Sequence, residues 1–177
     1  TGLPLLFLSL VPADPLAQPL IQDLIREYDG RYGDIPGRDP AVVELHRYPP
    51  ELFLPPRGRF LLVLRAGEAI AGGAFMPHAE EATAEVKRVW ARPDLRRQGL
   101  AARVVTELER LARLQGYTDL YLTTGSRQPE AVRLYRSLAY EPQFDLNVDA
   151  TKFSLLSFRK RLTMPLSALA DAAALPA

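Results

Sequence analysis

The chain has 177 residues, of which 47% are hydrophobic and 24% are charged, and its net charge is +1. These values are typical of one globular domain with a sizeable core, and they exclude a strongly basic protein that attracts nucleic acid through its overall field. The absence of cysteine excludes disulfides, thiolate metal sites and a cysteine nucleophile. The two histidines, His46 and His78, are isolated in the sequence, so we expect neither a metal site nor a histidine-based triad.

The first predicted element is a strand over residues 5–10, an apolar run bounded by prolines. The apolar stretch around it is too short to span a bilayer and lacks a basic region before it, so we expect a buried strand, no membrane contact and a cytoplasmic location. Asp14 and Pro15 then predict a helix start, as the N-cap and the first helical residue. Asp29-Gly30 predicts the end of that helix.

Residues 30–59 are the least regular part of the chain and hold many of its 16 prolines. A short helix is expected near residues 40–47. The segment is either a structural connector or a loop that faces a substrate, because long irregular loops in compact domains often line sites. The sequence leaves both interpretations open.

The rest of the chain alternates between strands and helices. We expect strands at residues 60–64 and 69–75, joined by a hairpin, further strands at 82–91, 119–123 and 152–162, and helices after Gly99 and Gln128. This order predicts an α/β (α+β) fold: a mixed, mostly antiparallel sheet of about seven strands with helices on both faces. We expect one domain over residues 1–162 and a frayed, alanine-rich tail over residues 163–177.

The most informative stretch is the loop Arg96-Arg97-Gln98-Gly99-Leu100-Ala101, which joins a strand to a strongly patterned helix. The helix has an apolar stripe and an opposite charged face, formed respectively by Leu100, Val104, Leu108 and Leu111 and by Arg103, Glu107, Arg110 and Arg113. The first N–H groups of a helix have no internal partner, and small residues let a ligand approach, so the loop can bind a pyrophosphate. Positive charge gathers in the same segment, at Lys87, Arg88, Arg92, Arg96, Arg97 and Arg103. The alternative is an ordinary turn with solvated arginines.

Two motifs support the ligand-binding interpretation. Residues 87–101, KRVWARPDLRRQGLA, resemble the central motif of the GNAT superfamily of acyl-CoA-dependent N-acyltransferases, (Arg/Gln)-x-x-Gly-x-(Gly/Ala), which stands between a strand and a helix. Residues 128–140, QPEAVRLYRSLAY, resemble the second motif of that superfamily, Asn-x-x-Ala-x-x-Leu-Tyr-x-x-x-Gly-Phe. The resemblance extends over residues 5–162 and is similar in detail to a bacterial subgroup of mostly uncharacterised acetyltransferases. It implies a GNAT-like fold.

The chain departs from the second motif at two positions. Gln128 stands where asparagine is usual, and its amide can still hydrogen-bond a ligand. Ala139 replaces the usual glycine, which predicts that the turn there is not left-handed.

The resemblance implies acetyl-CoA as cosubstrate. Backbone N–H groups of residues 97–102 would hold the pyrophosphate, with Arg96 and Arg97 adding charge nearby. The preceding strand would diverge from its parallel neighbour to admit the pantetheine arm, and a backbone N–H near Val89 would hold the thioester carbonyl and then the oxyanion. Trp90 would be part of the core or the wall of the cleft. Cofactor binding is thus assigned to Val89, Trp90, Ala91, Arg96, Arg97, Gln98, Gly99, Leu100, Ala101, Ala102 and Gln128.

Attack of an amine on a thioester needs a base for the ammonium proton and an acid for the leaving thiolate. Tyr135 occupies the tyrosine position of the motif, which implies the general acid; the alternative is a core residue on an apolar helix face. Glu85 matches the position of a general-base glutamate in the histone acetyltransferase branch, and strand alternation predicts that it shares a sheet face with Val89. The alternatives are a solvated glutamate paired with Lys87, or His78 as the base.

The function implied is N-acetyltransfer from acetyl-CoA to a primary amine of a small molecule or peptide, by direct attack. Alternatives are a module that binds acyl-CoA without turnover, transfer of a longer acyl chain, and an oxygen acceptor. Dimers are common in the superfamily, so a homodimer is an alternative to a monomer. We expect the acceptor to contact residues 28–59, which form the variable region.

Overall fold

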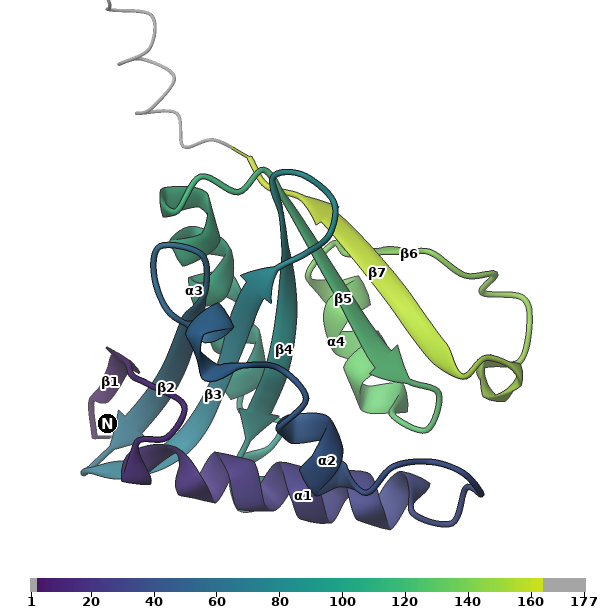
Figure 1. Cartoon of the computed structure of the whole chain (residues 1–177), viewed down its shortest axis with the longest axis horizontal. Coiled ribbons are helices and arrows are strands. Elements are labelled where there is room, and N and C mark those ends of the chain that lie inside the picture. Colours follow the sequence, from purple (N-terminus) through teal and green to yellow (C-terminus); the bar gives the residue numbers. More distant parts are fainter. Residues whose placement is uncertain (1–2, 164–177) are drawn as a thin grey trace, which may run out of the picture.

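The computed structural model describes residues 3–163, which form one seven-stranded sheet with helices on both faces (Figure 1). The strands follow the order β1-β2-β3-β4-β5-β7-β6 across the sheet. This architecture confirms the predicted α/β (α+β) class and the mostly antiparallel sheet of seven strands. Most of the predicted tail, from residue 164 on, lies outside the described residues.

The strand and helix boundaries agree closely with the sequence patterns. The strands are β1 (Leu5–Ser9), β2 (Arg59–Arg65), β3 (Glu68–Pro77), β4 (Thr83–Ala91), β5 (Asp119–Gly125), β6 (Glu141–Pro142) and β7 (Leu155–Arg161). The α-helices are α1 (Gln18–Tyr32), α2 (Ala41–Leu45), α3 (Leu100–Leu114) and α4 (Pro129–Ser137). Short 3₁₀ turns precede or connect them, at Pro15–Ala17, Pro50–Phe53, Pro93–Leu95 and Ala150–Lys152.

Three local expectations need correction. The predicted end of the first helix at Gly30 is wrong: α1 continues through Gly30 to Tyr32, because the packing of its apolar face outweighs the low helix propensity of one exposed glycine. The first strand is only partly buried, since β1 is an edge strand and Leu6 is 55% exposed. Ala139 is left-handed, with φ 65°, so the turn after α4 keeps the geometry for which glycine is usual.

The hairpin between β2 and β3 formed as predicted. Ala66 and Gly67 both have positive φ, at 50° and 80°, and Arg65 pairs with Glu68. Two such residues form a type I′ turn, whose twist matches that of the strands. Asp14 also acts as the predicted cap, because its side chain accepts a hydrogen bond from the N–H of Leu16.

One parallel pair interrupts the antiparallel sheet. β4 and β5 pair in parallel only over Thr83–Glu85 with Asp119–Tyr121, at one end of both strands. Beyond this short contact the two strands diverge, and Figure 1 shows the space between them widening toward α1 and α4. The sheet is therefore open in its middle, and this opening positions the site.

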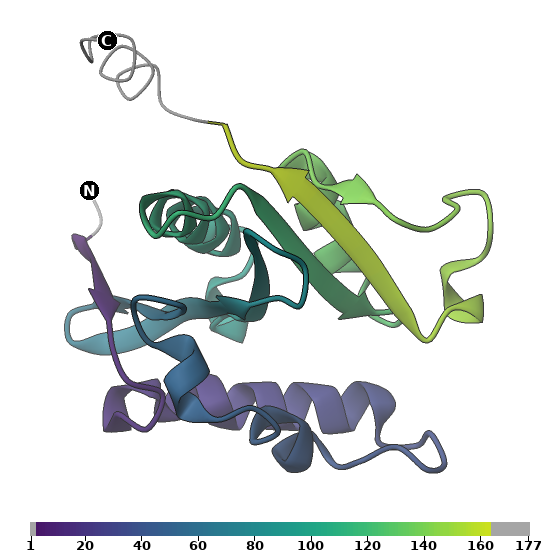
Figure 2. The same ribbon diagram turned by 45° about the horizontal axis from the view of Figure 1, so that its top comes forward.

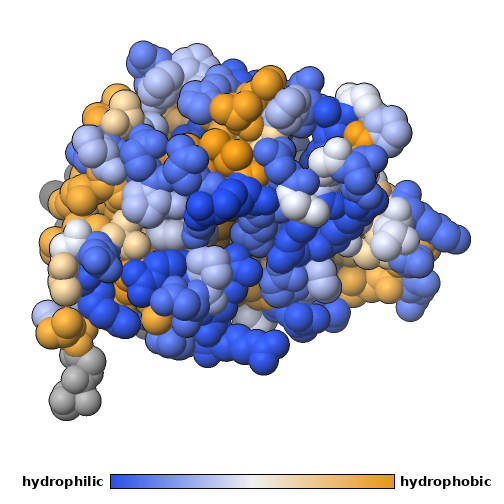
Figure 3. Space-filling view, turned by 90° about the horizontal axis from the view of Figure 1, so that it is seen from below, coloured by the Kyte–Doolittle hydropathy of each residue, from blue (hydrophilic) through white to orange (hydrophobic). Residues whose placement is uncertain are grey.

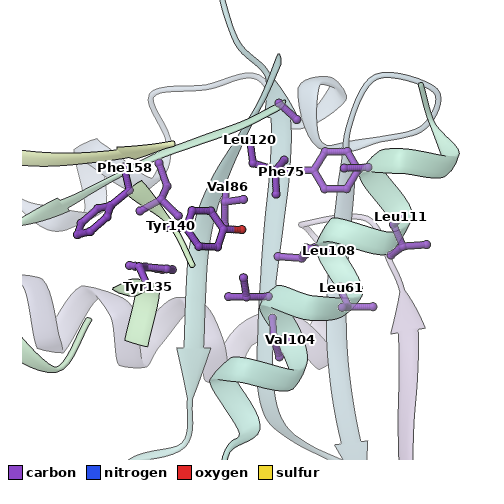
Figure 4. Close-up of a cluster of buried hydrophobic side chains, with 14 of the residues drawn as sticks. Leu61, Phe75, Val86, Val104, Leu108, Leu111, Leu120, Tyr135, Tyr140 and Phe158 are labelled. Carbon is purple, nitrogen blue, oxygen red and sulfur yellow. The ribbon is translucent and has the colours of Figure 1, made fainter. Parts of the chain in front are cut away.

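Two hydrophobic cores lie on the two faces of the sheet. Leu20, Ile21 and Leu24 of α1 pack on one face with Phe53, Phe60 and Trp90. The apolar stripe of α3 packs on the other face together with Tyr135, Tyr140 and Phe158 (Figures 2 and 4). Each fully buried leucine or phenylalanine contributes roughly 1.5–3 kcal/mol, so these faces hold α1, α3 and α4 firmly against the sheet.

The surface on the side of α1 is mostly hydrophilic, with hydrophobic atoms in separate patches (Figure 3). Among the helices formed by residues 3–163, none has the length and apolar character needed to cross a membrane.

Candidate active site

A cavity of about 700 Å³ opens where β4 and β5 diverge. β4 and β5 contribute one part of its wall, and the end of α1, the following loop and α2 contribute the other. About half of residues 28–48 thus line the cavity, which favours the substrate-facing interpretation for the first half of the irregular region. The wall includes Tyr28, Asp29, Tyr48, His78, Glu85, Lys87, Arg88 and Tyr121.

A β-bulge in β4 determines which side chains reach this cavity. Gly72 pairs with Trp90 and Ala74 with Lys87, so Arg88 and Val89 together oppose the single residue Gly73. Arg88 takes the left-handed conformation, with φ 59°. Gly73 is required here because a Cβ would lie 2.9 Å from Cγ1 of Val104, where α3 packs closely on the sheet.

The bulge corrects the expectation that Glu85 and Val89 share one face. Val86 and Val89 both pack against the α3 core, although strand alternation would place them on opposite faces. Glu85 instead points to the opposite face, into the cavity beside α1 and α2. A bulge re-aims the residues that follow it, so Val89 and Glu85 lie on different faces of β4.

Glu85 forms a compact polar cluster with His78 and Lys87. Its Oε2 lies 2.7 Å from Nζ of Lys87, and its Oε1 lies 3.7 Å from Nε2 of His78. Nδ1 of His78 accepts a hydrogen bond of 3.1 Å from the N–H of Glu80, which assigns the proton of a neutral ring to Nε2, facing Glu85. The ring of His78 also packs at 4.5 Å from that of Tyr121. The structure thus brings together the two candidate bases that the sequence left as alternatives.

Tyr135 lies on the opposite side of the sheet opening, in α4. Its ring is buried against Tyr140 and Phe158, at centroid distances of 5.6 and 5.8 Å (Figure 4). Burial, and next the neighbouring Tyr28, raise the pKa of the Tyr135 phenol. Tyr28 itself lines the cavity, so Tyr135 lies close to the cavity wall.

The hydroxyls of Tyr135 and Tyr140 differ in their partners. Tyr140 donates a hydrogen bond of 3.1 Å to the buried carboxylate of Glu109, which Lys160 also contacts at 3.0 Å. Burial and this carboxylate raise the pKa of Tyr140. Within residues 3–163, no hydrogen-bond partner of the Tyr135 hydroxyl is found, so it remains free to meet a ligand.

The loop before α3 exposes a run of backbone donors. Arg97 and Gly99 are both left-handed, with φ of 64° and 78°, and the first helical hydrogen bond runs from Arg103 N–H to Gly99 O. No atom of the described residues accepts a hydrogen bond from the N–H groups of residues 97–102. A Cβ added to Gly99 would meet no atom within 4 Å, so the space in front of the loop is open. Unpaired N–H groups at a helix N-terminus are suited to an anion.

Half of the predicted cluster of positive charge, Lys87, Arg92 and Arg96, is paired with carboxylates within the protein. Arg92 contacts Asp94 and Glu68, and Arg96 contacts Glu27 of α1 at 3.0 Å. Arg103 packs over the ring of Phe7. Arg97 and Arg103 remain next to the loop without a carboxylate partner among the described residues, so they can add positive charge to the backbone N–H groups there.

Two predicted cofactor residues have structural roles. Trp90 is 3% exposed in the core beside α1, and its indole N–H donates a hydrogen bond of 3.0 Å to Asp23. The amide oxygen of Gln128 accepts hydrogen bonds from Tyr32, Thr124 and the N–H of Gly125. The side chain of Trp90 therefore faces away from any ligand in the sheet opening, and Gln128 could contact one only through its amide nitrogen. Val89 and Ala91 remain on the α3 side of β4, partly buried.

Several residues of the cavity were not singled out from the sequence: Tyr28, Asp29, Tyr48, Arg88 and Tyr121. One signal was present for Arg88. In the stretch Val86-Lys87-Arg88-Val89, two charged residues separate two apolar ones. A regular strand would place Val86 and Val89 on opposite faces, whereas a bulge lets both face the core. Within residues 3–163, no group of three or more His, Cys, Asp or Glu side chains could hold a metal ion.

Comparison with known proteins places this geometry in a family. The sequence model of the acetyltransferase (GNAT) family matches residues 19–140, more than half of the chain. An IAA acetyltransferase of Azospirillum brasilense is 29% identical over 133 residues, which cover 75% of this chain and 83% of that protein. YjgM of Escherichia coli (strain K12), an uncharacterized N-acetyltransferase, is 28% identical over 130 residues, covering 70% and 75%.

Solved structures show the same fold. An acetyltransferase of the GNAT family from Staphylococcus aureus Mu50 has a TM-score of 0.69 at 10% identity, covering 90% of this chain and all of that one. The PaiA N-acetyltransferase of Thermoplasma acidophilum, in complex with coenzyme A, has a TM-score of 0.65 at 15% identity, covering 90% and 99%. With its central loop, divided sheet and family match, this chain belongs to the acetyltransferase (GNAT) family and is an acetyltransferase.

Proposed function

We propose that the protein transfers an acetyl group from acetyl-CoA to a primary amine by direct attack, with Glu85 as the base and Tyr135 as the acid. The observation that carries this proposal is the sheet opening. The polar cluster of Glu85, His78 and Lys87 lies on one side of it and the buried phenol of Tyr135 on the other, and the loop that follows β4 carries unpaired N–H groups at the start of α3. Each of the three functions of the reaction, holding the donor, removing a proton and supplying one, thus has a candidate group.

The N–H groups of residues 97–102 would hold the pyrophosphate of acetyl-CoA. They have no partner among the described residues, they point to open space, and the helix dipole favours negative charge there. Arg97 would add charge, whereas Arg96 would first have to leave Glu27. The backbone of Val89 and Ala91, on the strand that borders the opening, would bind the pantetheine arm and the thioester carbonyl.

Glu85 would take the proton from the amine. The carboxylate lines the cavity, and His78 and Lys87 hold its two oxygens. Nδ1 of His78 is engaged by the N–H of Glu80, which leaves Nε2 on the side of Glu85, so this ring would orient the carboxylate. Lys87 would position the other oxygen of the carboxylate, which it contacts at 2.7 Å.

Tyr135 would protonate the leaving thiolate. Because its pKa is raised, the phenol keeps its proton at neutral pH. The phenol would give up this proton as the C–S bond breaks, so that no free thiolate has to form in a buried site.

The test is a CoA-release assay with a panel of primary amines, using acetyl-CoA and longer acyl-CoAs as donors, with and without EDTA. We expect release with acetyl-CoA and at least one amine, unchanged by EDTA. No release above the hydrolysis background with any amine would reject the enzyme and favour a module that binds acyl-CoA without turnover. Faster release with a longer acyl-CoA would reassign the donor.

A further inference from the structure

The second feature of the cavity is Arg88, which the proposed reaction does not use. Arg88 occupies the bulge of β4 with φ 59°, a conformation that costs a residue with a Cβ on the order of 1 kcal/mol and is often found at functional sites. The bulge sends its side chain to the cavity wall, on the same side as Glu85 and Lys87. The fold therefore aims this arginine at the space that an acceptor would enter.

The surroundings of Arg88 position its guanidinium but provide no carboxylate to neutralise the positive charge. Its guanidinium lies 4.6 Å above the ring of Phe53 and donates a hydrogen bond to the carbonyl of Leu45. No carboxylate of the described residues lies within 4 Å of it, whereas Lys87 pairs with Glu85 and Arg47 pairs with Asp39 and Glu44. Arg38, the other cavity arginine without such a partner in this part of the chain, is exposed at the mouth.

The half-buried guanidinium of Arg88 has one carbonyl as its acceptor, so most of its N–H donors lack a protein partner among the described residues. Burial lowers the pKa of Arg88, which shows that the site penalises its charge. A guanidinium has five N–H donors in a planar fork, and two parallel hydrogen bonds to a carboxylate are its best-matched interaction. The ring of Phe53 fixes the plane of the fork, so less side-chain entropy is lost on binding.

We propose that Arg88 binds a carboxylate of the acceptor, so that the acceptor is an amino-carboxylic acid rather than a simple amine. The inference rests on the proposed function, which places the amine near Glu85. Glu85 and Arg88 lie three positions apart on one strand and line the same cavity, so an amine and a carboxylate of one small molecule can reach both. The residues of the loop before α3 do not line this cavity, so the arginine is not part of the expected pyrophosphate site.

The first measurement is equilibrium binding by calorimetry, with CoA at saturation, for two matched pairs of probes: L-phenylalanine with phenethylamine, and γ-aminobutyrate with propylamine. Each pair differs only by the carboxylate. In at least one pair, the wild-type protein should bind the carboxylated member at least about 10-fold more tightly, as expected for a charge-assisted pair. Equal affinities within both pairs would overturn the proposal without the need for any variant.

The second measurement assigns the preference to Arg88. Arg88→Gln should reduce affinity for the carboxylated member by about 10- to 100-fold and change affinity for the amine that lacks the carboxylate by less than about threefold. Arg88→Lys keeps a cation without the fork and should lose part of the preference. Arg110→Gln, on the exposed face of α3 and paired with Glu107, is the control and should leave both affinities unchanged.

The outcomes separate this proposal from the proposed reaction. Two results would show that Arg88 only packs against Phe53 and hydrogen-bonds Leu45. One is a preference for the carboxylated probe that persists in folded Arg88→Gln, and the other is a loss of affinity that is equal for both members of the pair. Carboxylate binding that depends on Arg88, without CoA release from acetyl-CoA, would support the inference and reject the catalytic assignment instead.

Discussion

Tyr135 was predicted to be either the general acid or a core residue, and its side chain has features of both. Its ring packs in the core, and its hydroxyl has no protein partner among the described residues. Tyr135→Phe keeps the ring, so the midpoint of denaturant unfolding should change little. Loss of the proton donor should lower kcat by about 10²- to 10⁴-fold, with a smaller change in the KM for acetyl-CoA. A kcat within about threefold of wild type, with chemistry rate-limiting, would assign Tyr135 to packing.

Glu85 and His78 can be distinguished by paired substitutions. Glu85→Gln removes the proposed base and should lower kcat by about 10²- to 10⁴-fold. His78→Gln keeps a polar group beside Glu85 but removes the ring that orients it, so kcat should fall by less than about 10-fold. The measurement is the pH profile of kcat/KM for both variants. If His78→Gln causes the larger loss and removes the limb at low pH, the histidine is the base and Glu85 orients it.

Ala139 tests the cost of a left-handed alanine directly. Its φ of 65° is unfavourable for a residue with a Cβ, and Ala139→Gly removes that penalty while increasing the freedom of the unfolded chain. The net effect should be a gain of about 0.5–1 kcal/mol in the free energy of unfolding, measured with urea. The matched control is Ala131→Gly in the helix α4, which should lose about 1 kcal/mol. If both substitutions lowered the free energy of unfolding equally, the left-handed conformation of Ala139 would not be strained.

At the scale of the elements, the sequence predicted order and type well because each depends on a local pattern. The stripe of α3 and the hairpin at Ala66-Gly67 are examples, since periodicity and turn chemistry act over a few residues. The bulge at Arg88 and the extension of α1 past Gly30 were missed. Both are decided by packing between distant segments, of α3 against Gly73 and of α1 against the sheet. The loop before α3 was therefore predictable, whereas the cavity wall, assembled from five helices and strands and the loops between them, was not.

The N-terminus of α3 makes a testable anion site as a unit. Gly99→Glu would place a carboxylate where the N–H groups of residues 97–102 point, and it should abolish measurable CoA binding in calorimetry. Two controls separate charge from backbone strain. Gly99→Ala carries the same positive φ without the charge and should retain binding. Gly116→Glu, at the other end of the same helix with φ 96° and open space, should also retain it. Unchanged CoA affinity in folded Gly99→Glu would reject the placement.

On the scale of the whole molecule, both cores meet at the sheet opening. Tyr28 comes from the α1 face and Tyr135 from the α3 and α4 face, yet Tyr28 lies near enough to add to the effect of burial, which is the main cause of the raised pKa of Tyr135. This proximity is consistent with the divergence of β4 and β5, because a continuous sheet would separate the two faces. The opening that admits ligands thus depends on how the two helical layers are held together.

Buried phenols connect this architecture to an alkaline limit on stability. Burial raises the pKa of Tyr28, Tyr32, Tyr117, Tyr135 and Tyr140 in the folded protein. Below about pH 10 these phenols are protonated in both the folded and the unfolded chain, so they make stability independent of pH. Above that value the unfolded chain releases protons that the folded chain retains, and stability must fall as pH rises.

We therefore expect the free energy of unfolding in urea to decrease above about pH 10, by up to about 1.4 kcal/mol per pH unit for each of the buried tyrosines Tyr135 and Tyr140. Absorbance at 295 nm, which reports tyrosinate, should rise together with the loss of circular dichroism. Tyr135→Phe should reduce the slope by about one phenol's share, because phenylalanine cannot ionise. If the tyrosines of the folded protein all ionised near pH 10 while its circular dichroism remained intact, the phenols would be solvated, and the opening at Tyr28 and Tyr135 would be far wetter than its packing indicates.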